Sequence, residues 1–169
     1  MSRQLIFIFL FFLIISCSRN DSERGLPPIN IKAEIIRTFD TIVSDTSKIK
    51  TTNIKLSLTN ISDKPITYWI MKCSWPQNWI VNKDIYSVLS FSCDSNYPIS
   101  IPLKPKESIS YNAFVCRTKF GTICTNENII KLGFIYIDAD MCKTMSDFSN
   151  IVGDKSKWNI IWSNSVELK

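Results

Sequence analysis

Apolar and polar residues alternate along most of the chain, and the clearest stretch reads TNIKLSLTN from position 52 to 60. There Ile54, Leu56 and Leu58 are separated by single polar residues. Because successive side chains of a strand point to opposite faces, this alternation predicts a strand with one buried face. Similar strand-like runs occupy Ile31–Arg37, Ile66–Met71, Tyr86–Ser92, Ile99–Leu103, Ser108–Val115, Ile129–Asp138 and Trp158–Ser163.

The spacing of these runs predicts an all-β fold with about eight strands. Each run is short, and turn-forming residues such as the NISDKP segment at 60–65 separate one run from the next. Short strands joined by turns are typical of an antiparallel β-sandwich. No segment sustains a period of about 3.6 residues, so helix is expected only as a short turn within Met141–Ile151. The sequence shows neither a repeat nor a second domain.

The first residues break this pattern with an apolar run, Leu5–Ile15, which is eleven residues long. As a helix it would span about 16 Å, at 1.5 Å per residue. The hydrocarbon core of a bilayer is about 30 Å thick, so the run is too short to cross. Arg3 precedes the run, and Ser16 and Cys17 follow it. A charge, a short apolar core and a small residue indicate a cleaved secretory signal.

The end of this run, Ile14-Ile15-Ser16-Cys17, resembles the lipobox of bacterial lipoproteins. The resemblance implies that residues 1–16 are a signal peptide and that Cys17 becomes the acylated first residue. Two or more acyl chains would anchor the protein stably in a membrane. We therefore expect a lipid-anchored protein of a Gram-negative cell envelope, in the outer membrane. Residues 17–30 would be a flexible tether and 31–169 the sandwich domain. The alternative is an ordinary signal peptide with an unrelated cysteine.

Two stretches of the predicted domain resemble immunoglobulin-like domains of bacterial secreted proteins, including those of the intracellular proteinase inhibitor type. LSLTNISDKPITYWI, Leu56–Ile70, is similar to their strand–turn–strand opening, and IPLKPKESISYNAF, Ile101–Phe114, to a later turn and long strand. Lys106 stands where that turn usually has glycine. The resemblance implies an immunoglobulin-like sandwich and transfers no functional residue.

Charge and composition exclude several classes of function. The net charge is +5, but the basic residues are scattered, so nucleic acid is not an expected partner. The chain has no histidine, which excludes Ser-His-Asp and Cys-His catalysis and any histidine-ligated metal. The four glycines leave no glycine-rich phosphate loop. No cofactor is expected.

Five cysteines remain beyond the signal peptide: Cys73, Cys93, Cys116, Cys124 and Cys142. In an oxidising envelope they are expected to form disulfides, with two bridges and one free thiol. Cys73 and Cys93 each follow a strand-like run, so their bridge would tie neighbouring strands. Cys116 would pair with Cys124 across a short loop, or with Cys142. A zinc site is the alternative, but the chain has no C-x-x-C motif.

The segment CSWPQNW, from Cys73 to Trp79, is the strongest candidate for a binding surface. Trp75 and Trp79 would be aromatic anchors on a loop held by a disulfide, and such anchors lose little entropy on binding. The alternative is that both tryptophans cover one end of the core, as most aromatic residues do.

Asp138 and Asp140, in IDADMC, are a weaker candidate. If the preceding strand continued, their carboxylates would point the same way and offer oxygen ligands to a divalent cation. Calcium loops usually add asparagine and glycine residues, which are missing here, so a solvated strand end is the alternative. An alternative function, a carboxylate-based envelope hydrolase or a cation-dependent binder, would be centred on these two residues.

The sequence therefore favours a non-catalytic binding or accessory lipoprotein. Its expected partners are the membrane, through the lipid, and another envelope protein, while the sequence names no soluble ligand. A purely structural envelope protein is the third possibility.

Overall fold

A computed structural model describes residues 25, 27–44, 47–90, 93–118, 128–142 and 144–169. The predicted signal peptide and Cys17 lie outside the described residues, as does Cys124. Within the described part of the chain, no helix combines the length and apolar character needed to span a membrane.

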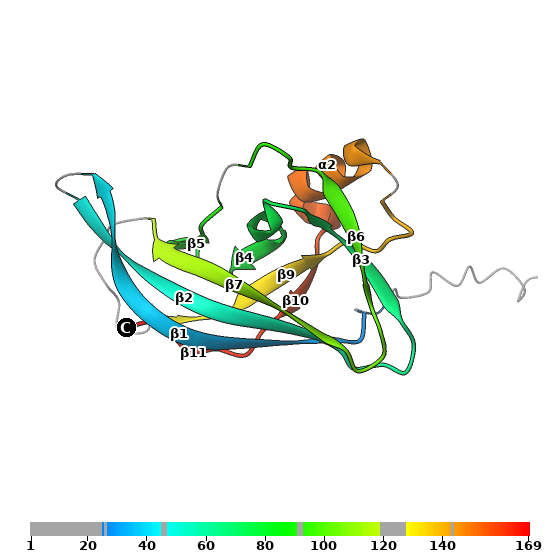
Figure 1. The fold of residues 1–169 in the computed structure, drawn as a ribbon, viewed down its shortest axis with the longest axis horizontal. Helices are drawn as coiled ribbons and strands as arrows, with labels where there is room; N and C mark the ends of the chain where they lie inside the picture. Colours follow the sequence, from blue (N-terminus) through cyan, green and yellow to red (C-terminus); the bar gives the residue numbers. More distant parts are fainter. Residues whose placement is uncertain (1–24, 26, 45–46, 91–92, 119–127, 143) are drawn as a thin grey trace, which may run out of the picture.

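The first layer is an antiparallel sheet of four strands (Figure 1). Its strands are β1 (Ile29–Ser44), β2 (Ser47–Asn60), β7 (Ser108–Arg117) and β5 (Tyr86–Val88), in the order β1-β2-β7-β5. The predicted alternation is confirmed here, because Ile54, Leu56 and Leu58 on β2 are fully buried. The polar residues between them point to the outer face, where Ser57 bonds Ser110 across the β2–β7 pair.

The second layer is assembled around β9 (Leu132–Tyr136), which is buried along its whole length. On one side β9 pairs with β10 (Asn159–Trp162), and on the other with β4 (Trp79–Val81). An antiparallel pair, β3 (Ile66–Met71) with β6 (Pro98–Leu103), joins just beyond β9, where Trp69 donates its N–H to the Ile137 carbonyl at 2.9 Å. The short pair of β8 (Ile129–Ile130) and β11 (Val166–Glu167) continues the layer at the other end.

The two layers enclose the main core, and the expected all-β sandwich is confirmed. The core includes Tyr68, Leu103, Val115, Leu132 and Phe134, which come from strands of both layers. A smaller apolar cluster under the helix α2 (Met145–Gly153) contains Phe148, Ile151 and Cys142. Eleven strands are present among the described residues, more than the eight expected. The expected run Ile129–Asp138 is divided into β8 and β9, and β4 and β11 are too short to show an alternation.

The helix α2 corrects the expected helical turn at Met141–Ile151, because it starts later and is longer. Thr144 is its N-cap, and the Thr144 hydroxyl accepts from the Asp147 N–H at 3.2 Å. The Asp147 carboxylate accepts from the Thr144 N–H at 2.9 Å, which completes a capping box. The helix therefore begins at a signal that local sequence carries.

The turns at one end of the sandwich are held by Asn60, whose side chain is fully buried. Its amide donates to the carbonyls of Lys64 at 2.7 Å and Leu103 at 3.1 Å, while its carbonyl accepts from the Ser62 N–H at 3.0 Å. In the neighbouring turn Lys106 has a φ of 62°, the left-handed conformation in which glycine is usual. The glycine missing from the sequence pattern is therefore replaced by a residue that adopts glycine's conformation.

Candidate functional site

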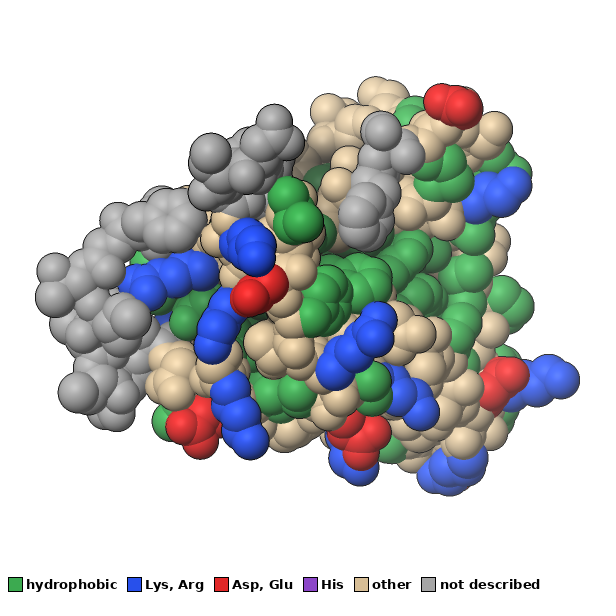
Figure 2. Space-filling model, turned by 60° about the vertical axis from the view of Figure 1, so that its left-hand side comes forward, with side chains coloured by type: hydrophobic (Ala, Val, Ile, Leu, Met, Phe, Trp, Pro, Cys, Tyr) green, Lys and Arg blue, Asp and Glu red, His purple; other side chains and the backbone are tan. Residues whose placement is uncertain are grey.

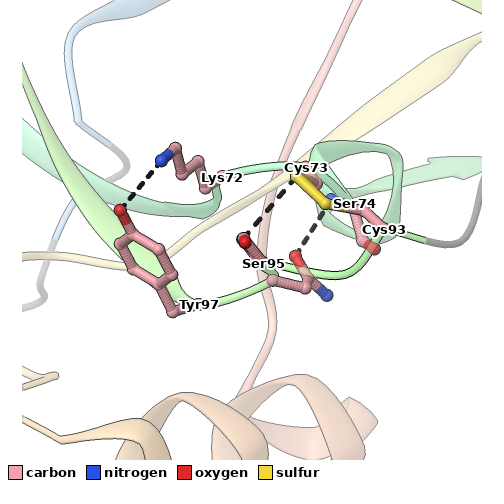
Figure 3. Close-up of a disulfide and its surroundings, with 7 residues drawn as sticks. Lys72, Cys73, Ser74, Cys93, Ser95 and Tyr97 are labelled. Atoms are coloured by element: carbon pink, nitrogen blue, oxygen red, sulfur yellow. Dashed lines mark hydrogen bonds between the residues drawn. A yellow bond between two sulfur atoms is a disulfide. The ribbon is translucent and has the colours of Figure 1, made fainter.

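A disulfide joins Cys73, just after β3, to Cys93 in the segment that leads to β6. The predicted bridge between these two cysteines is confirmed, and their Cα atoms are 5.9 Å apart. Figure 3 shows the bridge with the polar contacts around it. The Ser74 N–H donates to the Asn96 side-chain carbonyl at 3.1 Å, and the Cys73 sulfur lies 3.7 Å from the Ser95 carbonyl oxygen. The segment before β6 is therefore tied to the end of β3 at several points.

The structure separates the two tryptophans of the binding candidate. Trp79 starts β4 and is 4% exposed, with its ring centroid 5.0 Å from that of Phe134 in the core. Trp75 lies in the 3-10 helix η2 (Trp75–Asn78), is half-buried, and has its ring 5.0 Å from Tyr111 on β7. Only Trp75 is placed where a partner could contact it, and Trp79 takes the core role of the alternative interpretation.

Asn78, which the sequence gave no reason to select, explains why the two tryptophans diverge. Its side chain is fully buried between β3 and β9. The amide donates to the Trp69 carbonyl at 3.2 Å and the Ile135 carbonyl at 3.5 Å, and its oxygen accepts from the Met71 N–H at 3.4 Å. A buried amide is stable only when it is hydrogen-bonded, so these bonds fix η2 and turn the next residue inward.

A pocket of about 240 Å³ lies between the disulfide-linked segment and β7. Its apolar wall consists of Trp75, Pro76, Leu89 and Phe114, and its exposed rim includes Asn112. Figure 2 shows hydrophobic side chains gathered across one face of the molecule, with Lys and Arg side chains around them. The pocket lined by Trp75 and Leu89 is our candidate binding site, because an aromatic ring and a disulfide-linked segment meet there.

Asp138 and Asp140, the weaker candidate pair, lie just beyond the end of β9. The strand ends at Tyr136, and the Asp138 carboxylate accepts from the Asp140 N–H at 2.9 Å, which makes a tight turn. Both residues border a pocket of about 470 Å³ that Tyr136 also lines. Among the described residues, no three His, Cys, Asp or Glu side chains come together as a metal site would require.

Two of the remaining cysteines are free thiols. Cys116, on β7, and Cys142, before α2, are both buried, and neither belongs to a bridge, so the alternative Cys116–Cys142 pairing is wrong. The other predicted partner, Cys124, lies outside the described residues. Burial raises the pKa of both thiols, and the charge of Asp147 raises that of Cys142 further. A raised pKa disfavours the thiolate, so neither group is suited to nucleophilic chemistry near neutral pH.

The tyrosine hydroxyls near the core are also held in their neutral form. Tyr68 and Tyr111 share a hydrogen bond of 3.0 Å, and burial raises the pKa of both hydroxyls. Burial also raises the pKa of Tyr136, with the nearby Asp138 charge adding to the shift. These hydroxyls serve as hydrogen-bonding groups within the sandwich.

A larger pocket of about 500 Å³ is lined by residues of β2, β5 and β7 and by the last two residues of the chain. Lys50, Arg117 and Lys169 contribute cationic groups, and Val115 and Leu168 form part of its apolar wall. Arg117 and Asn128 lie close to either side of residues 119–127, which are outside the described part of the chain.

Comparisons with known proteins give one structural likeness. No family model matches the chain, and no curated protein matches it. Among solved structures, the chain is similar to one titled "Crystal structure of FixG-related protein from Vibrio parahaemolyticus", at a TM-score of 0.40 and 14% identity. The match covers 84% of this chain and 97% of that chain.

Proposed function

We propose that this protein is an envelope lipoprotein, anchored through Cys17, with an immunoglobulin-like sandwich that binds another envelope protein without catalysing a reaction. The observation that carries the proposal is the pocket beside the Cys73–Cys93 bridge. A site that binds a protein needs an apolar surface that is partly exposed and already ordered. Trp75 and Leu89 supply that surface, and the bridge holds it in place.

The remaining chemistry supports binding over catalysis. The chain has no histidine, and the buried thiols of Cys116 and Cys142 have raised pKa values. The Asp138 carboxylate is engaged in its own turn. Lipid attachment at Cys17 would hold the domain close to the membrane and so raise its local concentration around membrane-associated partners.

Photo-crosslinking in intact cells tests the proposal. A photoreactive residue placed at Asn112, an exposed residue of the pocket rim, should capture one dominant protein. The same residue placed at Ile61, which is 53% exposed in the turn after β2, is the control for random collisions. A Cys17→Ala form tests whether capture depends on the lipid anchor.

Matched variants locate the binding surface. Trp75→Ala and Leu89→Asp should remove the crosslink at position 112, because both change the pocket wall. Trp162→Ala, which alters a tryptophan 41% exposed on the second layer, should keep it. Each variant is checked for folding by its thermal melting curve. Equal crosslinking at positions 112 and 61, or full retention in the two pocket variants, would contradict the proposal.

A further inference from the structure

We draw no further inference here: the strongest candidate, the pocket of about 500 Å³ that Lys50 on β2 and Arg117 on β7 line, carries nothing, because it borders residues 119–127, which lie outside the described part of the chain, and because Asp40 stands opposite Lys50 in the β1–β2 register, so that nothing in the structure shows what would occupy it.

Discussion

Removal of the Cys73–Cys93 bridge tests how strongly the wall of the candidate pocket is coupled to the stability of the domain. The two cysteines are separated by 20 residues in the sequence. In the chain-entropy description, closing a loop of this length stabilises the folded state by about 3 kcal/mol, because the unfolded chain loses conformations. The double variant Cys73→Ser with Cys93→Ser is therefore expected to lose about that free energy of unfolding. Its melting temperature should fall by roughly 10 °C.

The assay is urea unfolding followed by tryptophan fluorescence, with and without dithiothreitol. The unchanged protein in dithiothreitol should become as unstable as the double variant, and the variant should not respond to the reductant. The fold should survive, because the Ser74–Asn96 bond and the Lys72 N–H to Tyr97 carbonyl bond, 3.0 Å long, do not depend on sulfur. A variant as stable as the unchanged protein would refute the reasoning. If dithiothreitol destabilised the double variant as much as it destabilises the unchanged protein, the bond that the reductant breaks would lie elsewhere.

Further predictions concern the turn at Lys106, the close packing at Gly133 and the buried tyrosines. Because Lys106 has a positive φ, the Lys106→Gly variant should be about 1 kcal/mol more stable than the Lys106→Ala variant in urea unfolding. Equal stabilities of the two variants would contradict a left-handed conformation at this position. A methyl group on Gly133 would lie 2.8 Å from the Trp162 ring. Gly133→Ala should therefore lower the free energy of unfolding by about 1–3 kcal/mol and change the environment of that indole. A loss below about 0.5 kcal/mol would mean that the ring moves aside freely. Tyr68 and Tyr136 have raised pKa values in the folded state, so unfolding releases their protons above about pH 10. Their contribution to stability is complete below that pH and is lost as the pH rises toward the folded pKa values. A denaturant series between pH 9 and 11, chosen about the ordinary tyrosine pKa, should therefore show a falling free energy of unfolding. A constant free energy of unfolding would contradict the burial of the hydroxyls.

The sequence alone predicted the parts of the fold that depend on short-range periodicity. Ile54, Leu56 and Leu58 are buried on one face of β2, as their alternation indicated, because neighbouring side chains of a strand point to opposite faces. The turn after Asn60 followed from residues that bond their own backbone. The bridge between Cys73 and Cys93 was also expected from their positions after two strand-like runs.

Only the tertiary structure decided which of these residues form a site. Trp75 and Trp79 are equivalent in the sequence, but the buried amide of Asn78 turns one into the core and leaves the other half-exposed. The pocket brings Cys73, Leu89 and Asn112 together from three separate stretches of the chain. The sequence determined the longer strands and which of their faces are buried, since both depend on neighbouring residues. Which residues line a common pocket depends on where distant strands lie in the sandwich, and no local pattern encodes it.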